Sequence, residues 1–185
     1  MRKVNRENTR PNYSNKIIRN EIILTKSLLV VYLLALIWII LFKMVFSLQE
    51  LPHIREINLI PFAGSVIINN QIDFDEIINN ILIFIPFGVY VSMLKPDWAF
   101  LKKVAPISIV SLLFEVLQFI FAIGATDITD FIGNTLGGII GIGLYLVFHK
   151  LFKTKVNINK IFNRMATIGT FSFIVLMGLL IFANK

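Results

Sequence analysis

Long apolar runs separated by short polar stretches dominate the pattern along the chain. A helix needs roughly 20 residues to cross the hydrocarbon core of a bilayer, and five of the runs reach or approach that length. The second run carries Asn79, Asn80 and Pro86, and we count it as spanning because the loop charges on either side require it. The pattern predicts five membrane-spanning helices, at about 27–48, 77–94, 104–123, 131–149 and 165–183.

The composition agrees with a membrane protein. Of the 185 residues, 56% are apolar and 16% are charged, which is less charge than a soluble domain of this length carries. The length indicates one domain, and five spans indicate an all-α integral membrane bundle. The chain has no cysteine, so disulfides, thiolate chemistry and cysteine metal ligands are excluded.

The loop charges alternate in sign along the chain. The segment before the first span and the loops near 95–103 and 150–164 are basic, whereas the loop near 49–76 and the one with Asp127 and Asp130 are acidic on balance. Because cytoplasmic loops are rich in Lys and Arg, this predicts a cytoplasmic N-terminus and an external C-terminus. The net charge of +7 is then a topology signal, with membrane lipids rather than nucleic acid as partners.

The same pattern divides the chain into three parts. Residues 1–26 form a basic cytoplasmic segment, a tail or a surface helix; residues 27–149 form the membrane core; residues 150–185 join a basic cytoplasmic loop to the fifth span. A basic start before an apolar run is also typical of a signal peptide, but no small-residue cleavage site follows this run. We therefore predict that the first span is retained.

Glu115 is the most unusual residue, because it lies near the middle of the third span. An ionisable side chain at that depth costs roughly 3 kcal/mol or more unless it is paired or protonated. Gln118 follows three positions later and shares its helix face, so both are expected to point into the bundle. Two interpretations are open: a functional site, or a polar clamp between helices.

Lys43 lies in the outer third of the first span. Its long side chain is expected to reach the level of Glu115 or Gln118, so an ion pair between Lys43 and Glu115 is one interpretation. The alternative is that Lys43 extends to the outer headgroups, as long basic side chains near helix ends do.

The turn between the third and fourth spans concentrates polar residues. Gly124 is expected to end the third helix. Thr126 or Asp127 is expected to cap the fourth helix, with Asp130 in its first turn, because carboxylates there satisfy free N–H groups. Capping does not account for Asn134, which lies one turn further on and on the same face as Asp130.

Gly133, Gly137 and Gly141 recur every four residues along the fourth span. Small residues at this spacing let two helix backbones approach closely in a membrane. We therefore predict helix packing at these glycines, which would draw Asn134 toward its neighbours.

Two apolar segments carry helix-breaking residues. The segment 57–68 is apolar around Pro61 and Gly64, and it either lies at the membrane interface or re-enters the bundle. Pro86 removes the helical hydrogen bond to the carbonyl of Leu82. The freed carbonyl is expected to accept from a ligand or a neighbouring helix, or simply to mark a kink.

The unusual polar residues gather on one side of the membrane. All are expected in its outer half or just above it: Asn58, Asn80, Glu115, Gln118, Asp127, Asp130 and Asn134. They predict a polar pocket that opens outward. Glu115, Asp127 and Asp130 are the candidates for acid–base chemistry. Such oxygens also suit a hard cation, but no spacing is diagnostic of a metal loop, and neither a metal nor a cofactor is predicted.

Several segments together resemble the VanZ-like family of bacterial membrane proteins: NLIPF (58–62), NILIFIPFG (80–88), FEVLQFIFAIGATDITD (114–130) and NTLGG (134–138). The resemblance begins at YLLALIWIILFK (32–43) and continues through the fourth span, and it includes the polar residues and their spacing. The family's recurrent positions map onto Asn58, Pro61, Asn80, Pro86, Glu115, Gln118, Asp127, Asp130 and Asn134.

The resemblance implies a protein of the bacterial cell membrane that gives low-level resistance to teicoplanin-type lipoglycopeptides without remodelling the cell-wall precursor. In the first hypothesis the outward pocket binds the drug or a lipid-linked cell-wall precursor, with Glu115 as the buried anchor, Asp127 and Asp130 at the ligand and Asn134 orienting them. A second hypothesis is an enzyme that modifies a lipid or precursor headgroup by carboxylate acid–base chemistry. A third is a structural or adaptor protein without a site.

Overall fold

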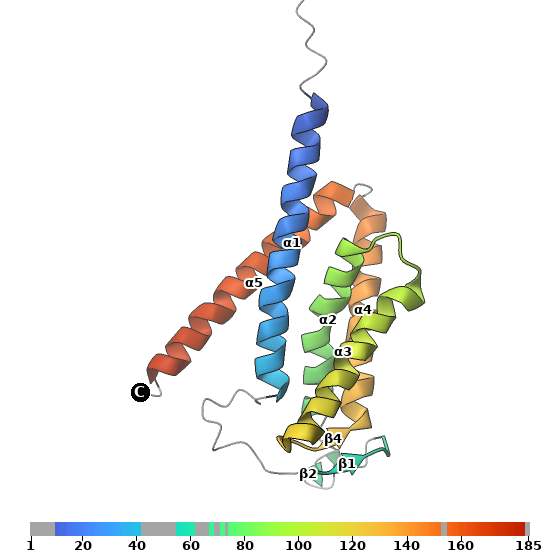
Figure 1. Ribbon diagram of the computed structural model, residues 1–185, viewed down its shortest axis with the longest axis vertical. Helices are drawn as coiled ribbons and strands as arrows, with labels where there is room; N and C mark the ends of the chain where they lie inside the picture. The colour runs from blue at the N-terminus through green and yellow to red at the C-terminus, as the bar shows by residue number, and fades with distance from the viewer. Residues whose placement is uncertain are drawn as a thin grey trace, which may run out of the picture. The chain divides into compact units, whose positions relative to one another are not determined.

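The computed structural model describes residues 10–41, 55–61, 67–68, 71–72, 74–152 and 155–183. Within these ranges five long helices confirm the predicted all-helical architecture. All five are long and apolar enough to cross a membrane. They are α1 (Arg10–Leu41), α2 (Asp75–Leu94), α3 (Phe100–Phe121), α4 (Ile128–Phe152) and α5 (Lys155–Ala183), as Figure 1 shows.

The largest difference from the predicted spans is at α1. The prediction began this span at residue 27, whereas the helix begins at Arg10 and its candidate membrane-spanning part at Asn15. Ile18 and Ile22 extend the apolar pattern toward the N-terminus, and a helix that is already nucleated adds residues at little cost. The predicted end of the span, including Lys43, lies outside the described residues.

The chain divides into two compact units. The core unit is Tyr32–Phe148, which holds the end of α1, all of α2 and α3, and most of α4. The terminal unit joins Met1–Val31 with His149–Lys185 and contains the beginning of α1 and all of α5. Every residue of the predicted pocket that the structure describes belongs to the core unit.

Glycines on α4 bring its backbone against α2, and the two helices lie next to each other with α3 in Figure 1. A Cβ atom added at Gly137 would overlap the backbone carbonyl of Ile81, and one at Gly141 would overlap that of Ile85. Gly133 is less crowded, because the nearest atom to its added Cβ would be 3.4 Å away. The small-residue pattern therefore coincides with close helix contact, as is common in membranes.

Pro86 lies inside α2 without ending the helix. It removes the backbone donor to the carbonyl of Leu82. The hydroxyl of Tyr32 on α1 donates to the next carbonyl along, that of Ile83, at 2.6 Å. The centroid of the Tyr32 ring also lies 5.6 Å from that of the Tyr90 ring. An aromatic side chain of α1 therefore packs against the part of α2 where Pro86 removes a helical hydrogen bond.

Two short strand pairs accompany the helices. β1 (Ile57–Asn58) pairs in parallel with β4 (Thr126–Asp127), and β2 (Ile67–Ile68) pairs antiparallel with β3 (Gln71–Ile72). The hydropathy pattern did not predict these strands, because a two-residue strand leaves no alternating pattern. Residues 62–66 lie outside the described part, so membrane re-entry of this segment stays a prediction.

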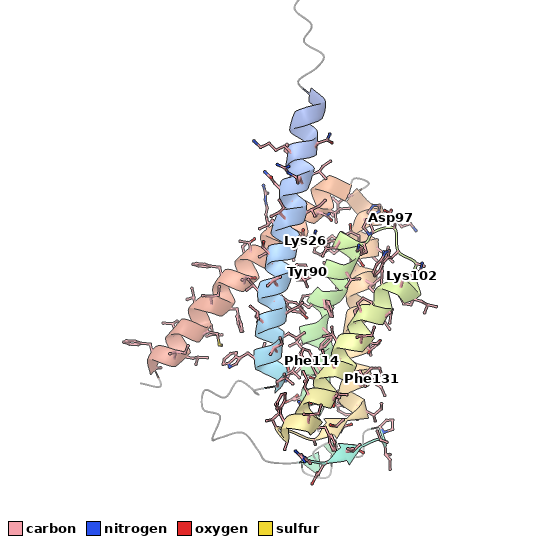
Figure 2. All side chains as sticks on the ribbon, viewed as in Figure 1. Lys26, Tyr90, Asp97, Lys102, Phe114 and Phe131 are labelled. Atoms are coloured by element: carbon pink, nitrogen blue, oxygen red, sulfur yellow. The ribbon has the colours of Figure 1, made fainter. Side chains whose placement is uncertain are left out.

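We call the two ends of the core unit the strand end, at β1 and β4, and the hairpin end, at the connection of α2 to α3. Asp97 and Lys102 lie at the hairpin end (Figure 2). Lys103 was predicted to lie in a loop, but α3 already begins at Phe100. Lys103 is 4% exposed and its Nζ donates to the carbonyl of Pro96 at 3.1 Å, so this lysine helps close the hairpin.

A buried polar contact joins α1 and α5 in the terminal unit. Nδ2 of Asn163 donates to the Glu21 carboxylate at 2.8 Å, and the Thr25 hydroxyl donates to Oδ1 of Asn163 at 3.0 Å. Asn163 and Thr25 are both 1% exposed. Interhelical hydrogen bonds of this kind commonly join helices within membranes.

Candidate functional site

The turn after α3 folds back along that helix. Ala122 ends α3 in the left-handed conformation, with φ 55°, and its N–H donates to the carbonyl of Phe119 at 3.3 Å. The N–H of Ile123 donates to the carbonyl of Gln118 at 3.1 Å. These bonds satisfy carbonyls that the end of a helix leaves free. The residue that reverses the chain is Ala122, and not the expected Gly124.

Glu115 holds this returning turn in place. The N–H of Asp127 donates to Oε2 of Glu115 at 2.9 Å, and the Thr126 hydroxyl donates to the Glu115 backbone carbonyl at 3.1 Å. Glu115 is 3% exposed, and a hydrogen bond to a carboxylate is stronger than one between neutral groups. The beginning of α4 is therefore fixed beside Glu115, nearly two helical turns before the end of α3 at Phe121.

Asp127 uses both carboxylate oxygens. Oδ1 accepts from the N–H of Thr129 at 2.7 Å, which is the capping bond of α4. Oδ2 accepts from Nδ2 of Asn58 at 3.0 Å, across a separation of 69 positions. The strand register also places Asn58 opposite Asp127, and the N–H of Thr126 donates to the carbonyl of Glu56 at 2.9 Å. The segment around β1 is thereby tied to the start of α4.

Two further pairs link the helices beneath this turn. Nδ2 of Asn80 on α2 donates to Oδ1 of Asp130 on α4 at 2.6 Å. Nδ2 of Asn134 on α4 donates to the Ser111 hydroxyl on α3 at 3.1 Å. Asn134 and Ser111 are 1% and 0% exposed, respectively. Amides on α2 and α4 thus connect three helices through hydrogen bonds.

Gln118 connects α3 to α1. Its Nε2 donates to the carbonyl of Ile40 at 3.2 Å, and it is 4% exposed. Ile40 lies near the end of the described part of α1. This amide therefore joins α3 to α1.

The structure brings the predicted residues together in pairs around one end of the core unit. We define the polar cluster as these residues with Ser111, which the sequence analysis missed: Asn58, Asn80, Ser111, Glu115, Gln118, Asp127, Asp130 and Asn134. Ser111 lies four positions before Glu115, on the same face of the helix. That spacing could have identified it. Lys43 lies outside the described residues, so its ion pair with Glu115 stays a prediction.

The described side chains include no group of three or more His, Cys, Asp or Glu that could hold a metal ion. The Asp127 carboxylate accepts hydrogen bonds from the backbone N–H of Thr129 and from the side-chain amide of Asn58. The arrangement is a hydrogen-bonding site made of carboxylates and amides, placed among helices long enough to cross a bilayer.

These features define a class: a multi-pass α-helical membrane protein with a buried polar cluster at one end of its bundle. A model of the VanZ/LLP1 family matches residues 29–149. The chain is also 44% identical over 135 residues to a protein named Protein VanZ from Enterococcus faecium, covering 72% of this chain and 80% of that protein. The chain therefore belongs to the VanZ/LLP1 family and is a bacterial multi-pass membrane protein. No solved structure matches it.

The whole polar cluster falls within the residues that the family model matches. The terminal unit falls mostly outside them, because α5 begins at Lys155. The cluster therefore lies in the part of the chain that the family model covers.

Proposed function

We propose that this protein gives low-level resistance to teicoplanin-type lipoglycopeptides and acts through the polar cluster. The observation that carries the proposal is the 44% identity to Protein VanZ over a region that contains the cluster. The family resemblance supplies the class of drug. Burial of Glu115 at 3% exposure adds a physical reason, because an ionisable group within a membrane bundle is costly and usually serves a function.

We further propose that the strand end faces the outside of the cell. The loop charges support this orientation, because the hairpin end carries Lys95, Lys102 and Lys103, and cytoplasmic loops are rich in such residues. The strand end carries the acidic residues Glu56, Asp127 and Asp130. The cluster then opens toward the outer leaflet, which is where a drug with an acyl tail or a lipid-linked cell-wall precursor would lie.

In this proposal the residues have separate roles. Glu115 anchors the turn and, with Asp130, offers acceptor oxygens to the ligand. Asp127 and Asn58 join β1 to α4, so they position the segment that covers Glu115. Asn134 orients the cluster from α4. Selectivity for teicoplanin over vancomycin follows from membrane anchoring, because the acyl chain concentrates the drug at the bilayer.

The test is drug susceptibility in a teicoplanin-sensitive Gram-positive host. Wild type, Glu115→Gln and Asp127→Asn are expressed at equal membrane levels, with Glu56→Gln as the matched control, because Glu56 is an exposed carboxylate at the same end of the core unit. We expect wild type and Glu56→Gln to raise the inhibitory concentration of teicoplanin but not of vancomycin. Glu115→Gln should return it to the level of the host alone.

Two results would contradict the proposal. If wild type gives no protection, the family resemblance does not extend to this function. If Glu115→Gln and Asp127→Asn protect as well as wild type, the polar cluster serves only to join helices. A purely structural protein would give the second result, because the hydrogen bonds of its cluster would only join its own helices.

A further inference from the structure

Two buried side-chain amides in the polar cluster form hydrogen bonds through their nitrogen atoms but not through their oxygen atoms. Gln118 donates to Ile40, and Asn134 donates to Ser111. The amide oxygens, Oε1 of Gln118 and Oδ1 of Asn134, are buried and accept from no donor in the described part of the chain. The two side chains are 4% and 1% exposed, so neither oxygen faces bulk solvent.

Such oxygens are unusual because most buried polar atoms in proteins have a partner. A buried acceptor without a donor destabilises the folded state by its lost solvation, and among lipid-facing helices this loss is not compensated by water. With no donor among the described residues, these two oxygens are open to donors that another molecule supplies.

The two oxygens belong to residues on either side of Glu115. Gln118 lies three positions after Glu115 on α3, and Ser111, the partner of Asn134, lies four positions before it. All three α3 residues are on its buried face. The carboxylate and the two amide oxygens thus follow about two turns of α3, and this series of acceptors complements a group that carries N–H or O–H donors.

The burial limits the size of that group. Glu115, Gln118 and Asn134 are each at most 4% exposed, so a head of a few atoms can reach them with small side-chain shifts. The glycosylated peptide of a lipoglycopeptide is far larger. A lipid headgroup is small enough, and it would reach the cluster by entering the bundle from the strand end.

Part of the rim of the cluster is apolar. Leu59 and Ile60, directly after Asn58, are 70% and 69% exposed, and Ile120 near the end of α3 is 54% exposed. Arg55 donates to the carbonyl of Ile120 at 3.2 Å, so the approach to β1 and the end of α3 adjoin each other. A polar interior with an apolar rim fits an amphiphile, whose acyl chain would follow the rim.

We propose that the amide oxygens of Gln118 and Asn134 bind the hydroxyl or ammonium head of a membrane lipid beside Glu115, and that this lipid, not the peptide of the drug, is the ligand of the polar cluster. The inference rests on the proposed function for the choice of site. It makes resistance an indirect effect, in which the protein acts on a lipid near the bound drug.

The test is the thermal unfolding of the full chain in vesicles of defined headgroup. Phosphatidylcholine has no donor on its head, phosphatidylethanolamine has an ammonium with N–H donors, and phosphatidylglycerol has hydroxyls. We expect wild type to unfold several degrees higher when a fraction of the phosphatidylcholine is replaced by one of the other two. A response to the ethanolamine lipid identifies an ammonium site, and a response to the glycerol lipid identifies a hydroxyl site.

Two variants remove one acceptor each at similar size, Gln118→Met and Asn134→Leu. Ser92→Ala is the control, because Ser92 on α2 is 0% exposed and its hydroxyl has no partner among the described residues, yet it lies near the opposite end of its helix from Asn80. We expect Gln118→Met and Asn134→Leu to lose the headgroup response, while Ser92→Ala retains it.

A series with wild type alone keeps the test decisive if a variant fails to fold. Successive methylation of the ethanolamine head replaces N–H donors while the positive charge stays. We expect the unfolding temperature to fall with each methyl group. An unfolding temperature that is the same in all these vesicles would overturn the inference and assign the oxygens to water, and so would variants that respond to headgroup as wild type does.

This outcome is separate from that of the susceptibility test. If wild type protects against teicoplanin but shows no headgroup response, only the lipid ligand is wrong. If it responds to headgroup but gives no protection, the site stands and the resistance function is wrong.

Discussion

Asp127 shows how a single side chain can form a local hydrogen bond and a long-range hydrogen bond at the same time. A cap at Thr126 or Asp127 follows from the sequence, because a side-chain oxygen before an apolar helix satisfies free N–H groups. The second bond of Asp127, to Asn58, does not follow from the sequence, because no local pattern relates residues so far apart. Glu115 is similar: its burial is predictable from hydropathy, whereas its partner, the N–H of Asp127, depends on how the turn returns.

At the residue scale, we expect Asp127→Ala to destabilise the protein more than Asp127→Asn. The alanine removes both the capping bond to Thr129 and the bond from Asn58, and loss of a cap costs about 1 kcal/mol. Asparagine keeps an acceptor for Thr129. The measurement is the free energy of unfolding in detergent, with Glu56→Gln as a control expected to match wild type. Equal losses for both Asp127 variants would mean that the charge, and not the cap, stabilises α4.

At the scale of elements, the close contact of α2 with α4 sets the geometry of the cluster. Gly137 and Gly141 let the two backbones lie in contact. This contact allows Nδ2 of Asn80 to donate to Oδ1 of Asp130 at 2.6 Å. A larger residue in α4 would separate the helices and stretch that bond. Helix packing and the polar cluster are therefore coupled through a few small residues.

We expect Gly137→Ala to destabilise the protein and Gly143→Ala to leave it unchanged or slightly more stable. A Cβ at Gly137 meets the backbone of Ile81, whereas one at Gly143 meets no described atom within 4 Å. Overpacking of this kind costs about 1–3 kcal/mol, while alanine in an open helix position gains up to about 1 kcal/mol. Unfolding by a denaturing detergent measures both. If the two variants behave alike, α2 and α4 are further apart than described.

At the scale of the whole molecule, the alternating charge of the loops predicts the orientation in the membrane. If all five candidate spans cross the membrane, the two ends of the chain lie on opposite sides. We expect the core unit to present its strand end outside and its hairpin end inside. The helix lengths agree with this arrangement, but length alone does not distinguish it from the inverse.

Orientation can be measured because the chain has no cysteine. We expect a membrane-impermeant maleimide to label Glu56→Cys in intact cells, and Lys102→Cys only after permeabilisation. Both positions are exposed, at the strand end and the hairpin end. A reporter fused to the C-terminus should be accessible from outside. The reverse labelling pattern would turn the cluster toward the cytoplasm and exclude an encounter with drug at the outer leaflet.

The sequence by itself determined the class of protein, its five apolar helices, a cap at Thr126 or Asp127 and the polar residues that the cluster contains apart from Ser111. These follow from hydropathy, local hydrogen bonding and helical spacing, which involve only neighbours in the chain. The start of α1 and the end of α3 at Ala122 were missed, because helix ends depend on weak local preferences.

Only the tertiary structure decided which polar groups meet. The pairing of Asn58 with Asp127, of Asn80 with Asp130 and of Asn134 with Ser111 depends on the packing of separate helices. It also revealed the two amide oxygens that find no donor among the described residues. The sequence shows that an amide lies in a membrane span, but whether each of its atoms has a partner depends on distances of a few ångström, which are fixed only when the helices pack.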